Sequence, residues 1–387
     1  MTAVWDLRDP FAAARREAGA LLGDFDDEAI ALVLRYHDVR GAATDHATFT
    51  SDTPFRVPIP SEESVREVRQ LPIETDPPSH ARYRAVVREI FSRPRQPDFV
   101  RAIELLVEEM VASVADGAEF DVVNAFALPL QSKALAILLG MPTEDAELWA
   151  TWGQHIFHSD DALDEQKGGE LDRYLRQQFE RAERSPGDDF FSALTSVSID
   201  DQPLSPDEKL GFANLAFAGG RDTVINTVSF ALAHLAACPS DRQRIRKNPE
   251  LARSAAEEVV RVVSPLTIIG RTCTRNTRVG DVGVQAGQRA ALCWASANRD
   301  EQVFAEPSRV DIGRRPNPHV GFGAAHHSCL GASHARLLLR SLLGRVAASV
   351  DDMTITEIEP HYETWPAYRR QTGYDRLMLT MTLGETA

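Results

Sequence analysis

Cysteine is scarce in this sequence of 387 residues, which has only four. The four are Cys238, Cys273, Cys293 and Cys329, and none belongs to a Cys-x-x-Cys pair. A disulfide framework is therefore not expected, and neither is a structural zinc site with paired cysteine spacings. For the first three, the expected role is that of a small buried hydrophobic side chain.

Excess positive charge, long apolar runs and a secretory leader are also missing. The chain has 42 Lys and Arg against 57 Asp and Glu, a net charge of −15, so it lacks the basic surface that nucleic-acid binding needs. We find no apolar run long enough to cross a membrane and no signal-peptide core. These absences predict a cytoplasmic protein that binds neither nucleic acid nor membrane.

The composition is that of a globular protein, with 43% hydrophobic and 26% charged residues. No internal repeat or low-complexity tract is present. The length alone allows two or three domains, or one large domain.

Cys329 differs from the other cysteines in its surroundings. The stretch PNPHVGFG before it is a loop broken by proline and glycine, and ASHARLLLRSLLGRVAASV after it has helical apolar periodicity. A helix N-terminus favours a thiolate, which is a nucleophile or a metal ligand. His326 or His327 could be the base of a cysteine hydrolase. The flanking glycines instead suit a flat, bulky group lying against the backbone.

The stretch FGAAHHSCLGASHAR resembles the haem-binding signature of the cytochrome P450 family, Phe-Gly-x-Gly-x-His-x-Cys-x-Gly ending in Ala-Arg. The matching positions are Phe322, Gly323, His327, Cys329, Gly331, Ala335 and Arg336. Ala325 stands where a second glycine is usual, and His334 where leucine is common. The resemblance implies a haem b cofactor with Cys329 as its axial iron ligand, bordered by Phe322, His327 and Gly331.

A second motif, FAGGRDTVINTV, lies in the longest helical pattern of the chain. Ser-Pro-Asp-Glu at 205–208 forms a capping box, and Pro239 ends a helix of about thirty residues. Gly219 and Gly220 each cost about 1 kcal/mol inside a helix. They mark either a notch for helix packing or a deliberate opening of the backbone. The second interpretation resembles the family's oxygen-binding kink, which implies that Thr223 supplies a hydrogen bond and Asp222 relays protons.

Two further sets of charged residues match the family. His80 and Arg84 lie four residues apart at the start of a helix, and together with Arg271 and His327 they resemble ligands of the haem propionates. Glu258 and Arg261 are three residues apart. In the family such a pair is a buried structural clamp, and Arg309 matches its third member.

The resemblance implies one cytochrome P450 domain over residues 1–387. It would be mainly α, with a small β-rich lobe from the N-terminal segment and residues near 264–312 and 353–384. The implied activity is a haem-thiolate monooxygenase that inserts one oxygen atom of O2 into a C–H bond. A haem-thiolate peroxygenase and a non-catalytic haem sensor or electron carrier remain alternatives, although neither needs Asp222 and Thr223.

The chain carries no flavin or iron–sulfur signature, so electrons would come from NAD(P)H through separate redox proteins. We expect a monomer served by a [2Fe–2S] ferredoxin and a ferredoxin reductase. A basic segment could receive an acidic ferredoxin: it contains Arg82, Arg84, Arg88, Arg93 and Arg95 against the single Glu89.

The substrate is predicted from polar residues near the expected pocket. Arg56, Arg66 and Arg69 lie in the loop expected above it, and Trp152, His155 and His158 lie in another segment near it. A steroid or fatty-acid pocket would be mostly apolar. We therefore expect a small oxygenated substrate such as an aromatic acid, a methoxylated ring or a methyl-ether sugar, which would undergo hydroxylation or oxidative O-demethylation.

Overall fold

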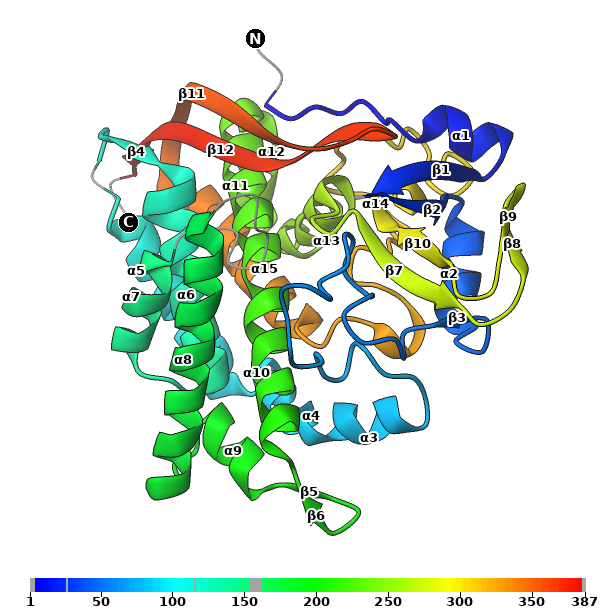
Figure 1. The fold of residues 1–387 in the computed structure, drawn as a ribbon. Helices are drawn as coiled ribbons and strands as arrows, with labels where there is room; N and C mark the ends of the chain where they lie inside the picture. Colours follow the sequence, from blue (N-terminus) through cyan, green and yellow to red (C-terminus); the bar gives the residue numbers. More distant parts are fainter. Residues whose placement is uncertain (1–3, 26, 115, 153–161, 385–387) are drawn as a thin grey trace.

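A computed structural model describes residues 4–25, 27–114, 116–152 and 162–384. Helices form the larger part of the molecule, and strands gather at one side and along the top (Figure 1). The expected architecture, mainly α with a smaller β-rich part, is confirmed.

A five-stranded sheet forms the β-rich side. Its order is β1-β2-β10-β7-β3, with β2 and β10 parallel and the other neighbours antiparallel. The strands are β1 Ala20–Phe25, β2 Glu28–Val33, β3 Phe49–Thr50, β7 Ile268–Cys273 and β10 Arg289–Cys293. Short helices and a hairpin accompany the sheet: α1 Ala12–Glu17, α2 Tyr36–Thr44, α14 Trp294–Ala297, β8 Thr277–Val279 and β9 Val282–Val284.

The last strands form a sheet of their own, which refines the expectation of a single β-rich lobe. β11 Val350–Trp365 and β12 Tyr368–Leu383 make a long hairpin, and β12 also pairs with β4 Glu119–Asp121. The hairpin runs across the helices at the top of the molecule (Figure 1). Residues 353–384 thus form strands as expected. Apart from pairing with each other, these strands pair with β4 and not with the N-terminal strands. A small hairpin, β5 Ser198–Ile199 with β6 Gln202–Pro203, lies at the opposite end.

The helical part is built around a long central rod formed by α10 Pro206–Gly220 and α11 Asp222–Ala237. The other helices are α3 Ser79–Val86, α4 Arg88–Ser92, α5 Pro97–Ala112, α6 Leu128–Leu139, α7 Thr143–Thr151, α8 Ala162–Arg184, α9 Phe190–Ser196, α12 Pro239–Lys247, α13 Leu251–Val263 and α15 Ala332–Ser349. Two short 3-10 turns, η1 Arg93–Arg95 and η3 Ala325–His327, and a π-helical turn, η2 Val122–Ala127, complete the set.

One helical stretch corrects the expectation about apolar runs. Residues Val122–Leu139, formed by η2 and α6, are long and apolar enough to span a membrane, with mean hydropathy 1.6, and 72% of the stretch is buried inside the protein. The central rod with α12 also passes as a pair bent by 98°. Because η2 and α6 pack against α5, α7 and α11, the stretch behaves as a core helix.

Candidate active site

Cys329 lies where the sequence predicts, in the loop that leads into α15. Its backbone N–H donates to the carbonyl oxygen of Phe322 at 2.7 Å, and its sulfur faces the N–H groups of Gly331 and Ala332. Burial raises the pKa of the thiol, while these N–H groups, Arg84 and Arg336 act in the opposite direction. The N–H groups at the start of α15 thus favour the thiolate, as expected, but burial outweighs them in the pKa of this thiol.

The same cysteine is exposed on one side even though protein crowds it on the others. The ring of Phe322 beside it is covered by the guanidinium of Arg336 at 4.4 Å.

The loop explains the departure at Ala325. Gly323 has φ +73° and Ala325 has φ +56°, so both are in the left-handed region. Glycine adopts this region freely, whereas alanine costs roughly 1–2 kcal/mol. Ser328 supports the turn by donating from both its N–H and its hydroxyl to the carbonyl of Ala325, at 3.2 and 2.6 Å. The loop thus keeps its shape with alanine in the glycine position.

His334 replaces the usual leucine as a neutral ring. It is 8% exposed, its ring meets Phe99 edge-on at 5.8 Å, and burial lowers its pKa to about 4. At neutral pH it is an uncharged aromatic group in an apolar position.

Imidazoles from distant segments gather beside the cysteine loop. The ring centroid of His80, on α3, lies 4.4 Å from that of His327 and 5.4 Å from that of His326. The Nε2 atoms of His80 and His327 are buried without a hydrogen-bond partner. Burial, with the positive charges of Arg84 and Arg271, lowers the pKa of His80 to about 4. The predicted set of His80, Arg84, Arg271 and His327 is therefore brought together.

Arg271, on β7, is a buried cation whose counter-ion is not apparent. It is 2% exposed, and its side chain donates to the carbonyl of Gly270 at 2.7 Å. Across the described part of the chain, no carboxylate lies within ion-pair distance of it. Burial lowers its pKa to about 10, with Asp76 acting weakly the other way. Buried charges are normally paired. Orphaned imidazoles beside such a guanidinium suit a ligand that carries carboxylates, so these residues fit the propionates of a haem.

Two residues of this cluster, His46 and Asp76, were missed in the sequence, and His326 was considered only as the base of a cysteine hydrolase. His326 lies within 5.3 Å of His46, measured between ring centroids, and Asp76 accepts hydrogen bonds from Thr50 and from the N–H of Ser51. The doubled histidine at 326–327 was a usable signal, whereas nothing local marks His46 or Asp76.

The central rod is interrupted as the glycine pair suggested. α10 Pro206–Gly220 and α11 Asp222–Ala237 are separated by Arg221, at φ −101° and ψ −83°. The capping box of Ser205 and Glu208 is present at its start. The predicted extent of about thirty residues is correct, but the rod is two helices.

The surroundings of Gly219 and Gly220 decide between the two interpretations, a notch for helix packing and an opening of the backbone. A Cβ added to Gly219 would meet nothing within 4 Å, and one on Gly220 would be in ordinary contact with Leu135 at 3.7 Å. A packing notch needs a close neighbour at the glycine, so Gly219 instead borders open space. Side chains bond to the carbonyls here: Thr223 Oγ1 donates to Gly219 at 3.0 Å, and Gln131 Nε2 to Gly220 at 2.9 Å.

One face of this rod is open near the break. Leu215, Ala218, Gly219 and Asp222 follow helical spacing and are half-buried or exposed, whereas Phe217 on another face is 1% exposed and packs on Trp149 at 4.8 Å. Asp222 and Thr223 thus lie at the end of the open face.

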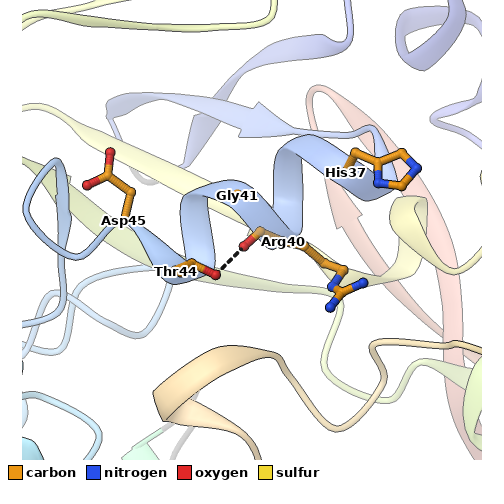
Figure 2. Close-up of a pocket in the computed structure, with 5 residues that line it drawn as sticks. All are labelled: His37, Arg40, Gly41, Thr44 and Asp45. Carbon is orange, nitrogen blue, oxygen red and sulfur yellow. Dashed lines mark hydrogen bonds between the residues drawn. The ribbon is translucent and has the colours of Figure 1, made fainter.

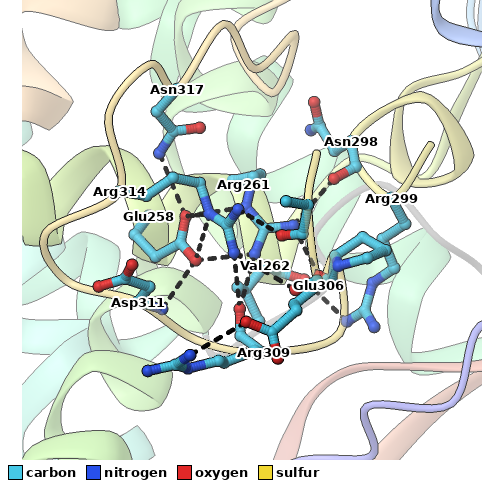
Figure 3. Close-up of polar contacts among 12 residues, drawn as sticks. Glu258, Arg261, Val262, Asn298, Arg299, Glu306, Arg309, Asp311, Arg314 and Asn317 are labelled. Atoms are coloured by element: carbon cyan, nitrogen blue, oxygen red, sulfur yellow. Dashed lines mark hydrogen bonds and ion pairs between the residues drawn. The ribbon is translucent and has the colours of Figure 1, made fainter. Parts of the chain in front are cut away.

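The buried clamp exists, but one member differs from the prediction (Figure 3). Arg261 donates to both carboxylate oxygens of Glu258, at 2.7 and 2.8 Å. The third charged member is Arg314, whose Nε lies 3.1 Å from each of these oxygens. The prediction that Arg309 is the third member is wrong. Its backbone carbonyl accepts a hydrogen bond from Arg261, but its exposed side chain pairs with Glu306 at 3.0 Å.

The arginines of the predicted substrate loop are bound to neighbouring acids. Arg66 pairs with Glu62 and Glu74, and Arg69 with Asp52 and the carbonyl of Glu74. Arg56 pairs with Glu28 at 2.9 Å. These ion pairs hold the loop together, so the three cations already have acidic partners within the protein.

Other residues proposed near the substrate are placed as follows. Trp152 is 5% exposed and packs on Tyr174, while His155 and His158 lie outside the described residues.

Two surface hollows lie apart from Cys329. An open one of about 460 Å³ on α2 is lined by His37, Arg40, Gly41, Thr44 and Asp45 (Figure 2). A smaller one, of about 210 Å³, lies between α3 and the β5–β6 hairpin.

Comparison with known proteins agrees with this geometry. A family model described as Cytochrome P450 matches residues 135–364. The chain is 31% identical to a cyclomarin C epoxidase of Salinispora arenicola, over 86% of each chain, and 31% identical to a linalool 8-monooxygenase of Pseudomonas putida, over 69% of this chain and 68% of that one.

A solved structure described as a carbohydrate active P450 superimposes with a TM-score of 0.94 at 40% identity, over 97% of this chain and 98% of that chain. The fold, the cysteine loop and these relatives together place the protein: it belongs to the cytochrome P450 family of haem-thiolate monooxygenases.

Proposed function

We propose that the protein binds haem b, with Cys329 Sγ as the protein atom that would hold the iron. The iron would favour the thiolate form of Cys329. His80, Arg84, Arg271 and His327 would hold the two propionates, which offer acceptors to Arg271 and to the orphaned imidazoles. The whole described chain would act as one catalytic domain, a cytoplasmic monomer.

The bound haem would supply oxygen activation, and the chain's own residues would control protons and access. Gly219 leaves space beside the rod, and Thr223 holds a hydroxyl at the edge of that space. Asp222, at the first turn of α11, would pass protons inward, and Thr223 would deliver a hydrogen bond to the reacting oxygen. These two residues favour a monooxygenase over a peroxygenase or an electron carrier.

The proposed substrate is a small, neutral, oxygen-rich molecule such as a sugar methyl ether. Arg56, Arg66 and Arg69 are already paired with acids of the protein, and this compensation of their charges disfavours an aromatic acid as the substrate. The likeness to a carbohydrate active P450 supports a sugar. Hydroxylation of a methoxy C–H gives a hemiacetal that loses formaldehyde, so the net reaction would be oxidative O-demethylation.

Electrons would come from NAD(P)H through a ferredoxin reductase and a [2Fe–2S] ferredoxin. Within the predicted basic segment, Arg82 pairs with Asp200, and Arg93 donates to the carbonyls of Leu138 and Asp188. Arg88 and Arg95 are exposed, so they are the cations best placed to meet an acidic ferredoxin.

The observation that carries the proposal is the buried, unpaired imidazole and guanidinium cluster beside a cysteine that is open on one side. The test is the carbon monoxide spectrum of the reduced protein, which is red-shifted when a thiolate ligates the haem. Cys329→Ser should remove the shifted band and almost all turnover, while Cys273→Ser should keep both. A shifted band that survives Cys329→Ser would assign the ligand elsewhere.

The substrate class has a separate test. Methyl ethers of neutral sugars should shift the haem spin state and release formaldehyde in proportion to NAD(P)H consumed. If long-chain fatty acids or steroids give full spin shifts while sugar ethers and methoxylated rings give none, the proposed substrate class is wrong.

A further inference from the structure

A second group of metal-ligating side chains lies at the corner between α11 and α12, remote from Cys329. Pro239 stands at the first position of α12, and the rod and α12 are bent by 98°. The bend turns the first turn of α12 back over the last turn of α11. His234, Cys238 and Asp241 meet there.

The three side chains are close enough to share one ion. His234 Nε2 lies 2.9 Å from Asp241 Oδ2, and the ligand atoms of His234, Cys238 and Asp241 all lie within 4.8 Å of one another. His234 is 5% exposed and its ring stacks on Phe230 at 6.0 Å, which fixes its orientation. Cys238 and Asp241 are half-buried, so the group can be reached from solvent.

We propose that His234, Cys238 and Asp241 bind one divalent transition-metal ion of the zinc class. Zinc takes nitrogen, sulfur and carboxylate oxygen at about 2.0–2.3 Å, and three protein ligands leave a fourth tetrahedral position for water. A thiolate ligand disfavours magnesium and calcium, which prefer oxygen alone. Only small side-chain shifts are needed to bring the three ligand atoms to bonding distance from one ion.

The local charges are compatible with a cation. Arg244 Nη1 pairs with Asp241 Oδ1 at 2.8 Å, which leaves Oδ2 directed at His234. His234 Nε2, Cys238 and Asp241 Oδ2 thus offer one nitrogen, one sulfur and one oxygen ligand within reach of a single ion.

The site is independent of the proposed haem chemistry. His234 lies eleven residues after Thr223 on the same helix, which corresponds to about 16 Å. A bound ion would instead fasten α11 to α12 and stabilise the corner. A ligand that binds only the folded state raises the unfolding temperature as its concentration increases.

The test uses the haem-loaded protein after treatment with a chelator. Calorimetric titration with Zn²⁺ should give one equivalent per chain at this site, and Cd²⁺ should produce an ultraviolet thiolate-to-cadmium charge-transfer band. Cys238→Ala should abolish the band and weaken Zn²⁺ binding by about 100-fold or more, and Asp241→Asn by about tenfold. Both variants should remain folded by circular dichroism because neither residue is fully buried.

A second control deals with the other cluster of suitable spacing, Asp76, His326 and His327. His326→Gln should leave the cadmium band and the Cys238-dependent equivalent unchanged. The proposal is overturned if the native protein gives no charge-transfer band, or if Cys238→Ala binds Zn²⁺ as tightly as the native protein.

Discussion

The guanidinium of Arg261 and the carboxylate of Glu258 form an ion pair of 2.7 Å, and neither side chain is exposed to solvent. The same guanidinium also donates to the carbonyls of Asn298 at 2.9 Å and Pro307 at 2.8 Å. α13 is thereby attached to the segment that precedes the cysteine loop. A buried pair of this kind need not add net stability, but each partner is costly to remove singly.

We expect Glu258→Gln to destabilise the protein by about 3–5 kcal/mol, because it leaves the charge of Arg261 buried without its partner. The measurement is the free energy of unfolding of the haem-loaded protein in denaturant. Arg309→Ala is the matched control, since its side chain is exposed at 64% and should change stability by no more than about 0.5 kcal/mol.

Arg314→Ala distinguishes the two candidates for the third member of the clamp. Its side chain is 10% exposed and bonds to both oxygens of Glu258, so we expect a clear loss of stability. Equal stability of the Arg309 and Arg314 variants would contradict the arrangement in Figure 3.

The sequence predicts the parts of this molecule that local chemistry determines. The cysteine loop has fixed spacing, the capping box at Ser205 marks a helix start, and Gly219–Gly220 marks the break in the rod. The capping box follows from the backbone preferences of a few adjacent residues, whereas the cysteine loop and the break were recognised through short stretches that resemble family motifs. The α3 start and the pairing of Glu258 with Arg261 are local in the same sense.

The parts that escaped prediction depend on contacts between distant segments. Arg314 reaches Glu258 across 56 residues, and Arg69 reaches Asp52 across 17. The sequence does not distinguish Arg309, which has a nearby acidic partner, from Arg314 as the third member of the clamp. Similarly, the family resemblance implies strands near residues 353–384, but the pairing of β12 with β4 is set by tertiary packing.

The second prediction concerns proton delivery at the rod break. Thr223→Val should keep substrate binding and NAD(P)H consumption but divert reducing equivalents to hydrogen peroxide, because the hydroxyl is lost while the side-chain volume is retained. Thr223→Ser should restore coupling. Product and peroxide yields per NAD(P)H are the measurement, and Thr227→Val, one turn further along α11, is the control.

Asp222→Asn should act on rate more than on coupling. Loss of a general acid or base typically slows turnover by about 10²–10⁴-fold. If rate and coupling are unchanged in both the Thr223 and Asp222 variants, these side chains only support the helix break, as the hydrogen bond from Thr223 to Gly219 would allow.

The third prediction concerns the redox partner. Arg88→Glu should slow reduction by an acidic ferredoxin and flatten its dependence on ionic strength, since exposed charges steer association through a screened field. Stopped-flow reduction at several salt concentrations is the measurement. Arg8→Glu is the charge-matched control, because Arg8 is 81% exposed and lies in the N-terminal segment, at the other end of the molecule from α4. Identical salt dependence of both variants and the native protein would exclude this docking face.

The fourth prediction concerns pH and the carboxylate of Glu257. Burial acts to raise its pKa, but hydrogen bonds from His319 and Arg336 outweigh burial and hold the pKa at about 2, below its ordinary value of 4.5. Since the folded-state pKa is depressed, the stabilisation is fully present above about pH 4.5 and is lost as the pH falls toward 2. These bonds attach α13 to α15 and to the loop before Cys329.

Glu257→Gln should therefore lower the unfolding temperature at pH 7, and its difference from the native protein should shrink as the pH is reduced from 4.5. The measurement is thermal unfolding by circular dichroism between pH 7 and 3. Glu250→Gln, whose side chain is 78% exposed beside Arg253, should follow the native protein throughout and so corrects for general acid effects. A constant difference between Glu257→Gln and the native protein across this range would mean that the carboxylate contributes through its shape and not through its charge.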